Sequence, residues 1–372
     1  MKTLNMVDLN GQYKKIKPEI DKAIRQVIDS SAFIKGPQVK EFETNLADFL
    51  NVKHVIGCAN GTDALQIALM ALDLDQGDEI ITPDFTFIAT AEVISLLKLK
   101  PVFVDVDPAT FNIDPGQVRK AITKKTKAII PVHLYGLCSN MKELLSVANE
   151  HDLYLVEDNA QALGAIYDDG DTTGMAGTLG TIGCTSFFPS KVLGCFGDGG
   201  ALMTNDDTIA EKIRCIANHG ARVKYYNDEI GVNSRLDTIQ AAILNVKLKY
   251  LKQYVTSRQE AAGYYSSRLN TLQSVTTPSI PDYSDHVFHQ YTIRLNDNRD
   301  ALKKYLAEQG IPTMIYYPVP LHFQKAFKAS GNFPVTEKLT ETVLSLPMHT
   351  ELTTAEQSYI CDKIEAFIND NQ

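Results

Sequence analysis

Clusters of cysteine are missing from this sequence. Its six cysteines are dispersed, without a C-x-x-C or Cys/His metal spacing. A chain of 372 residues can bury a full hydrophobic core without disulfides. We therefore interpret the cysteines as small buried hydrophobic residues in a reducing compartment, and we expect a cytoplasmic protein. They are Cys58, Cys138, Cys184, Cys195, Cys215 and Cys361.

Long apolar runs and an excess of positive charge are also lacking. The N-terminus has no apolar stretch typical of a secretory signal, and no uncharged run reaches the roughly 18 residues that membrane spanning requires. Lysine and arginine number 36 against 45 aspartates and glutamates, a net charge of −9. This balance argues against nonspecific binding to nucleic acid. Only 22 glycines and 15 prolines occur, which excludes a collagen-like or low-complexity architecture.

Helical and strand-like patterns alternate through the first two thirds of the chain. Two amphipathic helices are predicted over 16–28 and 39–49, separated by Gly36 and Pro37. Between residue 53 and about residue 206, short apolar runs alternate with helical segments, and the rhythm predicts a mostly parallel sheet flanked by helices. Ligands of such sheets bind at the carboxyl ends of the strands. The predicted strands are HVIGCA, DEIITP, PVFVDV, AIIPVHL, LYLVED, TSFF and GALMT.

The pattern changes after residue 233, where a long helical stretch leads into a smaller α+β domain. We expect residues 1–250 to form the large α/β domain, N-terminal helices included, and residues 251–372 to form the small one. The small domain is predicted to contain a strand at FHQYTIRL, a helix at DALKKYLAEQ, a turn at Gly310, a strand near MIYYP, and helices near 335–344 and 353–368.

Two strand ends carry candidate ligand-binding residues. In GCANGTDALQIAL, Gly61 permits a tight turn and Thr62 opens a helix, whose N-terminal N–H groups suit a phosphate. An ordinary strand-to-helix turn capped by the threonine is the alternative. Asp158 ends the apolar strand LYLVED, where a carboxylate is costly unless it meets a cation or hydrogen-bond donors. It could instead cap the following turn.

Lys191 lies in the most informative segment, TSFFPSKVLGCFGDGGALMTND. Apolar neighbours destabilise the charged form of a lysine and make its amine available as a Schiff-base nucleophile. A surface lysine is the usual alternative, but the aromatic strand before it and the glycine-rich turn after it argue against that interpretation. The glycines do not match a dinucleotide fingerprint, because they lead into a strand and not a helix.

Together these elements supply what pyridoxal phosphate requires: a phosphate cup, an anion for its ring nitrogen and an amine for its aldehyde. Asp158 would keep the ring nitrogen protonated, and Lys191 would carry a proton between the substrate carbon and the cofactor. Ser186 could add a hydroxyl to the phosphate cup. Phe87 could stack on the ring, although an aromatic residue there could equally be ordinary core.

At these residues the sequence resembles the DegT/DnrJ/EryC1/StrS family of sugar aminotransferases. These are pyridoxal-phosphate enzymes of fold type I that aminate keto groups on nucleotide-linked sugars. The resemblance covers nearly the whole chain, through the blocks FIKGPQVKEFE, GCANGTDALQIAL, GDEIITPDFTFIATAEVI, PVFVDVD, VEDNAQALGA, SFFPSKVLGCFGDGGA, NHGA, GVNSRLDTIQAAIL and IYYPVPLH.

The resemblance implies a role for each matching residue. It makes Lys191 the lysine joined to the cofactor and Asp158 the partner of the ring nitrogen, with Gln161 close to the ring. It implies that Asn233 reaches the phosphate from a neighbouring subunit, and hence a homodimer with two shared active sites. Without the resemblance, Asn233 would be a turn or helix-start residue. The residues implied to bind the phosphate and cover the ring are Gly61, Thr62, Ser186 and Phe87.

Substrate contacts are implied for Tyr317 and His322, near the mouth of the sugar site, and for Arg235. The last matches members that act on 3-keto nucleotide sugars with a uronic carboxylate, which arginine can bind in bidentate fashion. A structural salt bridge is an equal alternative. The sequence departs from the common pattern of the family at Ser190, where Gly or Ala is frequent, and at Val192, where many members have Asn. Both differences could alter how Lys191 is positioned.

The resulting prediction is an aminotransferase that moves an amino group from L-glutamate to a UDP-linked 3-keto sugar derived from N-acetylglucosamine, or to its uronate. The product would serve surface polysaccharide or lipopolysaccharide synthesis. A 4-keto or dTDP-linked sugar is the alternative acceptor. A dehydratase would have histidine in place of Lys191, and a noncatalytic regulatory protein would be expected to lose Lys191 or Asp158. No metal site is expected, because the histidines lack ligand spacing.

Overall fold

The computed structural model describes residues 4–327 and 329–371. Its main sheet contains β1 (His54–Cys58), β2 (Glu79–Pro83), β3 (Lys100–Val104), β4 (Thr126–Ile129), β5 (Tyr154–Asp158), β8 (Ile182–Ser186) and β9 (Gly200–Thr204). The seven strands lie in the order β1-β9-β8-β5-β4-β2-β3. Those from β8 to β3 in this order are parallel, and β9 is antiparallel to both its neighbours. All seven predicted strands occur and the mostly parallel sheet is confirmed, although β8 ends at Ser186, before the two phenylalanines of the predicted strand TSFF.

Helices cover both faces of this sheet. On one face, a single apolar cluster joins the strands to α2 (Pro37–Leu50), α5 (Pro115–Ala121), α6 (Met141–Glu150) and α8 (Thr238–Leu248). A second cluster joins the other face to α3 (Gly61–Met70), α4 (Ala89–Leu96) and α7 (Asp207–Ile216). Neighbouring strand residues alternate between the clusters, since Ile81 belongs to the first and Ile80 to the second. This alternation fixes the sheet and therefore the positions of its strand ends.

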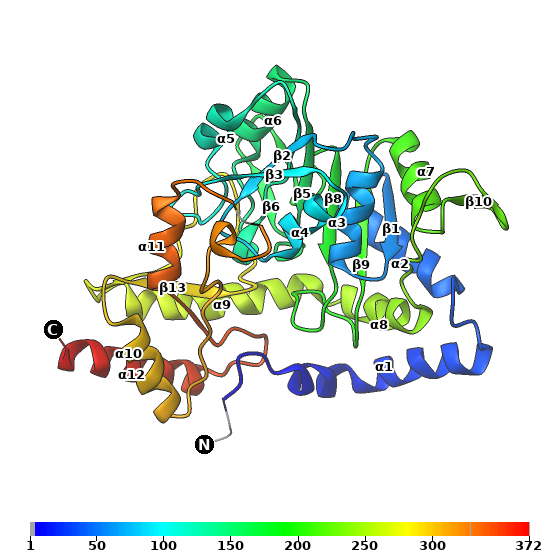
Figure 1. Ribbon diagram of the computed structural model, residues 1–372. Coiled ribbons are helices and arrows are strands. Elements are labelled where there is room, and N and C mark those ends of the chain that lie inside the picture. Colours follow the sequence, from blue (N-terminus) through cyan, green and yellow to red (C-terminus); the bar gives the residue numbers. More distant parts are fainter. Residues whose placement is uncertain (1–3, 328, 372) are drawn as a thin grey trace.

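A layer of long helices runs below the sheet in the view of Figure 1. It consists of α1 (Leu9–Ser30), α8 and α9 (Leu251–Leu269). Ile16 and Ile20 of α1 pack against Ile243 and Val246 of α8. The predicted N-terminal helices are therefore confirmed, and the long helical stretch after residue 233 is divided into two helices.

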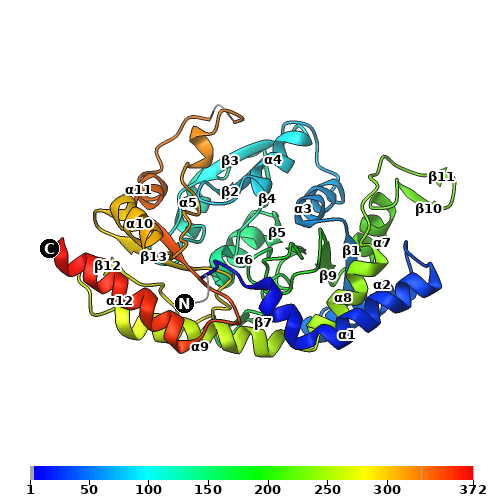
Figure 2. The ribbon, with the colours of Figure 1, turned by 90° about the horizontal axis from the view of Figure 1, so that it is seen from below.

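The C-terminal part has its own sheet and its own core. Antiparallel strands β12 (Val275–Thr276), β13 (Tyr291–Leu295) and β14 (Val343–Leu346) are accompanied by α10 (Arg299–Glu308), α11 (Pro334–Thr342) and α12 (Thr354–Asp370). This core also includes Leu4, so the described residues that precede α1 reach the C-terminal part (Figure 2). The division at residue 250 stays a prediction; α8 ends at Leu248 and α9 begins at Leu251.

The strand predicted near MIYYP is wrong. Met314 forms only an isolated bridge with Ser345, and the next residues are in a loop that contains Pro318 and Pro320. Proline has no backbone N–H to donate to a strand ladder, which explains why pairing stops there. The helix predicted over 335–344 ends at Thr342, and the chain continues as β14.

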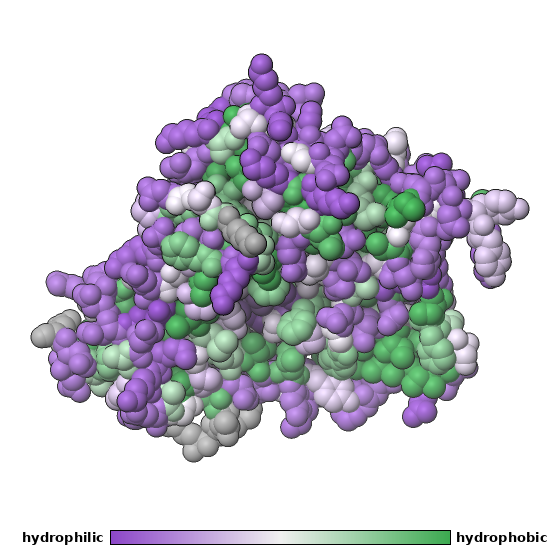
Figure 3. Space-filling view, viewed as in Figure 1, coloured by the Kyte–Doolittle hydropathy of each residue, from purple (hydrophilic) through white to green (hydrophobic). Residues whose placement is uncertain are grey.

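Two short hairpins were not predicted. One is formed by β6 (Ile166–Asp168) and β7 (Thr173–Met175), and the other by β10 (Ala221–Val223) and β11 (Tyr226–Asn227). The second hairpin stands clear of the rest of the molecule in Figures 1 and 3. Its apolar side chains therefore have few neighbours within this chain.

The six cysteines are buried and free, as predicted. Within residues 4–327 and 329–371, no helix combines the length and the apolar character needed to cross a bilayer.

We expect Phe42→Ala to destabilise the large domain, because its ring packs edge-on against Phe187 at 5.3 Å in a fully buried core. Removal of a buried phenyl ring costs about 3–5 kcal/mol. Urea unfolding followed by circular dichroism measures the loss. Leu96→Ala is the matched control, since Leu96 is 66% exposed and should change stability by less than about 0.5 kcal/mol. Equal stability of the two variants would contradict this account.

Candidate active site

The carboxyl ends of four strands surround one cavity of about 590 Å³. The loop after β1 contributes Gly61, the loop after β2 contributes Phe87, and β5 and β8 end at Asp158 and Ser186. Ligands of parallel α/β sheets bind at this edge, where loops can approach a ligand while the strands hold them in place. Loops from the C-terminal part close the cavity from the opposite side.

Lys191 lies in the loop between β8 and β9 and lines this cavity. Its amine has no hydrogen-bond or ion-pair partner anywhere in the part of the chain that the structure describes. Burial lowers the pKa of Lys191 to about 8, and the negative charge of Asp158 opposes that shift. A substantial fraction of the amine is therefore neutral near physiological pH, as a nucleophile requires.

Asp158 lies on the same cavity wall and is only 6% exposed. The hydroxyl of Thr90, on α4, donates to its Oδ2 at 2.8 Å, and the Ala160 N–H donates to its Oδ1 at 3.2 Å. Burial raises the pKa of Asp158, whereas these hydrogen bonds and the charge of Lys191 lower it. Among the described residues the carboxylate has no direct ion pair, so a cationic ligand group would complete its surroundings.

The backbone beside Asp158 is anchored by its neighbour Glu157. The fully buried carboxylate of Glu157 lies 2.7 Å from His133 Nε2 and accepts backbone N–H groups of Gly177, Leu179 and Gly180. Breaking any one of these hydrogen bonds would leave a buried polar group unpaired, which is energetically costly. The network is therefore rigid. It fixes the end of β5, and with it the position from which Asp158 extends.

The turn before α3 has the form expected of a phosphate site. Asn60 is the N-cap, and its side chain accepts the Asp63 N–H at 2.8 Å, so the helix begins at Gly61 and not at Thr62. The N–H groups of Gly61 and Thr62 have no acceptor among the described residues. A Cβ on Gly61 would lie 2.7 Å from Cβ of Ser186, so only glycine allows this close approach.

Aromatic residues from the C-terminal part form the opposite wall. The hydroxyl of Tyr317 accepts a hydrogen bond from Gln161 Nε2 at 3.1 Å, and Gln161 Oε1 accepts the Tyr135 N–H at 2.8 Å. Phe87 lies 6.0 Å from Tyr317, ring centre to ring centre. The structure thus brings Gln161, Phe87 and Tyr317 together with the residues described above.

Three predicted site residues do not line this cavity. Asn233 is exposed on the chain segment before α8, and Arg235 lines a separate pocket. His322 is buried, and its Nδ1 lies 2.5 Å from Oδ2 of Asp84 while its N–H donates to Oδ1 of the same carboxylate at 2.8 Å. Within this chain, His322 therefore fastens the loop that carries Tyr317 to the loop after β2, and its contact with a sugar stays a prediction.

Sequence reasoning missed several residues of the cavity. Tyr135, His289, Gln290 and Tyr316 line it, and Thr90 supports Asp158 from behind. Thr90 and Asp158 are 68 positions apart, and neither segment contains a pattern that pairs them. Only the alternation of strands and helices, which brings strand ends together, pointed to this region.

The residues present fit pyridoxal phosphate. Among the described residues, an amine without a hydrogen-bond partner and a carboxylate without an ion pair share one cavity, and unpaired backbone N–H groups lie beside a serine hydroxyl at a helix N-terminus. A helix N-terminus attracts a phosphate, the carboxylate suits a protonated ring nitrogen, and the amine suits an aldehyde. Each of these groups therefore lacks a partner that this one cofactor would supply.

Comparisons with known proteins agree with the cavity. The sequence profile of the DegT/DnrJ/EryC1/StrS aminotransferase family matches residues 14–365. A pleiotropic regulatory protein of Geobacillus stearothermophilus is 49% identical over 97% of this chain and 98% of its own length. The UDP-2-acetamido-2-deoxy-3-oxo-D-glucuronate aminotransferase of Pseudomonas aeruginosa is 46% identical over 96% of this chain and 98% of its own length.

Solved structures have the same fold. A DegT/DnrJ/EryC1/StrS aminotransferase from Brucella abortus is 42% identical and matches with a TM-score of 0.94, over 98% of this chain and 99% of its own. NtdA from Bacillus subtilis, solved with bound cofactor PMP, is 32% identical with a TM-score of 0.90, over 98% of this chain and 83% of its own. The predicted fold type I architecture is therefore confirmed.

In cofactor-free protein, we expect labelling of Lys191 by an amine-reactive reagent to be half-maximal near pH 8. The neutral amine is the reactive form, and its fraction rises as the pH passes the pKa of about 8, well below the usual value of about 10.4. Mass spectrometry of the labelled peptide measures the profile.

Asp158→Asn should move this profile to lower pH, because the carboxylate raises the pKa of the amine. Asp198→Asn is the control, since Asp198 lines the same cavity but is exposed. A wild-type midpoint near pH 10 would show that the amine is not desolvated.

Proposed function

Because this chain belongs to the DegT/DnrJ/EryC1/StrS aminotransferase family, we propose that it transfers the amino group of L-glutamate to a UDP-linked 3-keto sugar. The enzyme class follows from the family: the chain is a pyridoxal-phosphate-dependent sugar-nucleotide aminotransferase. The proposed acceptor is a derivative of N-acetylglucosamine, its uronate included, and the amino sugar serves surface polysaccharide or lipopolysaccharide synthesis. The shared cavity of Lys191 and Asp158 is the observation that carries the proposal.

The proposed roles of the central residues follow from their chemistry. Pyridoxal phosphate, when bound, supplies an aldehyde that takes up the amino group and a ring that withdraws electrons from the adjacent carbon. Lys191 would hold the aldehyde, and its neutral amine would accept the proton from the donor carbon and return it. Asp158 holds a proton on the ring nitrogen, which its buried position favours because a carboxylate there needs a positive partner.

The remaining residues of the cavity are proposed to bind the cofactor and orient it. The N–H groups of Gly61 and Thr62 and the hydroxyl of Ser186 bind the phosphate in this proposal. Phe87 covers one face of the ring. Gln161, fixed by its hydrogen bonds to Tyr135 and Tyr317, lies at the ring edge and positions it.

Sugar binding is assigned to the side of the cavity formed by Tyr317. His322 supports that wall through Asp84, and this geometry favours a positioning role for it over direct contact. Arg235 binds the carboxylate of a uronate. No ion pair joins Arg235 to another described residue, which argues against the alternative of a structural salt bridge.

A homodimer with shared active sites is part of the proposal. Asn233 and Arg235 do not reach the cavity of their own chain, so each would serve a second copy. The projecting β10–β11 hairpin and the residues after it support this arrangement, because Tyr225 is 84% exposed and Ile230 is 87% exposed. Exposed apolar side chains of this kind mark contact surfaces.

A noncatalytic regulatory role is the second candidate, and the relative from Geobacillus stearothermophilus is the observation that favours it. Both Lys191 and Asp158 are present here, which favours catalysis. A 4-keto or dTDP-linked acceptor is the alternative within catalysis. The cytoplasm is the proposed compartment, supported by six buried free cysteines.

We expect the cofactor-loaded protein to convert L-glutamate to 2-oxoglutarate in step with amination of a UDP-3-keto-N-acetylglucosamine derivative generated in situ. Lys191→Ala should lower the rate roughly 10²–10⁴-fold, because a proton carrier is removed. Lys120→Ala, at an exposed position outside the cavity, is the control. Mass spectrometry measures the amino sugar. Preferred conversion of a dTDP-4-keto sugar would show that the proposed acceptor is wrong. A failure to convert glutamate would favour the regulatory role.

Mixing of two inactive variants tests the shared site. We expect Lys191→Ala and Asn233→Asp to be inactive alone, the second because it places a negative charge beside the phosphate. Co-expressed, they should recover about a quarter of the wild-type activity, since half of the dimers are mixed and each of these has one intact site. Activity of the purified mixture measures this. No recovery would mean that Asn233 serves its own chain.

A further inference from the structure

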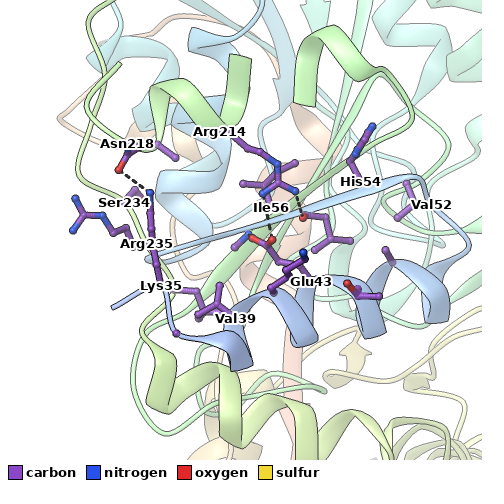
Figure 4. Close-up of a pocket in the computed structure, with 18 of the residues that line it drawn as sticks. Lys35, Val39, Glu43, Val52, His54, Ile56, Arg214, Asn218, Ser234 and Arg235 are labelled. Atoms are coloured by element: carbon purple, nitrogen blue, oxygen red, sulfur yellow. Dashed lines mark hydrogen bonds and ion pairs between the residues drawn. The ribbon is translucent and has the colours of Figure 1, made fainter. Parts of the chain in front are cut away.

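A second pocket, of about 560 Å³, lies beside α2 and the segment before α8 (Figure 4). Five basic residues line it, and only two acidic ones do, Glu43 and Asp48. Both oxygens of Glu43 are already occupied, one by the Gly57 N–H at 2.9 Å and the other by Arg214 at 3.2 Å. Lys53 forms an ion pair with Asp207, so the charges without an ion-pair partner among the described residues are those of Lys35, Lys40 and Arg235. The basic residues are Lys35, Lys40, Lys53, Arg214 and Arg235.

Lys35 and Arg235 stand together at one end of this pocket (Figure 4). Within the described part of the chain, the only hydrogen-bond partner of the Lys35 amine is Asn218, whose Oδ1 accepts at 2.9 Å. The buried Nε of Arg235 has no partner among the described residues. The two cations are close enough that the charge of Arg235 lowers the pKa of Lys35, in addition to the effect of burial. The charge of Glu43 raises the pKa of Lys35, but this effect is smaller than that of Arg235. Part of the repulsion between the two cations therefore remains, and an anion bound between them would offset it.

Three chain segments hold this pair in place. Lys35 lies between α1 and α2 in a left-handed backbone conformation, with φ of 53° at nearby Ser31 and 52° at Lys35 itself. Asn218, after α7, forms a β-bridge with Asn233, which fixes the partner of Lys35 against the segment of Arg235. Non-glycine residues in this conformation cost about 1–3 kcal/mol and persist where the surroundings hold them, often at binding sites.

The main cavity has the opposite balance of charge. Lys191 is the one basic residue among the described residues that line it, against the acidic Asp158 and Asp198. A nucleotide sugar carries a diphosphate, and a uronate adds a carboxylate. Within one chain, the cavity supplies no free cation for these groups, because Lys191 is committed to the cofactor in the proposed function.

We propose that Lys35 and Arg235 form a binding site for an anionic group of the nucleotide sugar whose ring lies in the main cavity of a second copy of the chain. The anion is the diphosphate or the uronic carboxylate. This inference rests on the proposed function and adds Lys35 to it as a residue that determines affinity and specificity. Ser234, between Asn233 and Arg235, accepts the Ala59 N–H at 3.0 Å, which ties the pair to the turn that leads into α3.

Calorimetric titration of the cofactor-loaded protein tests the proposal with three probes: UDP, UDP-N-acetylglucosamine and its uronate. Lys35→Gln should weaken binding roughly tenfold, as expected for loss of a charge-assisted hydrogen bond. The salt dependence of binding should become shallower, because one ionic contact is lost. Lys35→Arg should restore most of the affinity, since it keeps the charge.

Lys40→Gln is the matched control, because it removes the same charge from the same pocket without touching the pair. Weaker binding of all three probes to Lys35→Gln identifies the diphosphate, and weaker binding of the uronate alone identifies the carboxylate. Either result supports the proposal. Wild-type affinity of Lys35→Gln for all three probes, or an equal loss in Lys40→Gln, overturns it.

The outcome is separable from the proposed function. If wild-type protein fails to convert L-glutamate but Lys35→Gln still loses affinity for the probes, the transamination is wrong and the anion site stands. If glutamate is converted and Lys35→Gln binds every probe as the wild type does, the enzyme stands and this site is wrong.

Discussion

Burial of Lys191 and Asp158 in one cavity is the constraint on which the rest of the structure depends. A buried amine and a buried carboxylate each lose hydration, and neither has a direct ion pair with a described residue to offset that loss. The pKa of Lys191 falls to about 8 and that of Asp158 rises. Both groups are thereby prepared for a ligand that brings an aldehyde and a positive ring nitrogen.

Hydrogen-bond donors around the cavity stabilise the buried carboxylates at the end of β5. Thr90 and the Ala160 N–H bind the carboxylate of Asp158, while His133 and three backbone N–H groups bind Glu157. None of these hydrogen bonds involves the Lys191 amine. The framework that fixes the end of β5 thus also fixes the carboxylate whose charge raises the pKa of the Lys191 amine.

A second theme is the separation of charge between two pockets. The main cavity has more acidic than basic residues, and the pocket of Lys35 and Arg235 has the reverse. Under the proposed function, a substrate with several negative charges would need cations beyond Lys191. Under the proposed dimer, one chain contributes the chemistry of the cofactor and the other contributes cations, so assembly would be a condition of substrate binding and not only of stability.

The sequence by itself determined the order of the main-sheet strands and their helices and the mostly parallel sheet, because hydrophobic periodicity is a local property. It also singled out Lys191 and Asp158, which the structure places in one cavity and whose catalytic roles stay proposals. It also allowed a strand at MIYYP that does not form. Only the tertiary structure decided that His322 pairs with Asp84, that Thr90 supports Asp158, and that Arg235 lies beside Lys35 and away from the main cavity. These contacts join residues far apart in the chain, and no local pattern encodes which distant side chains will meet once the strands and helices have packed.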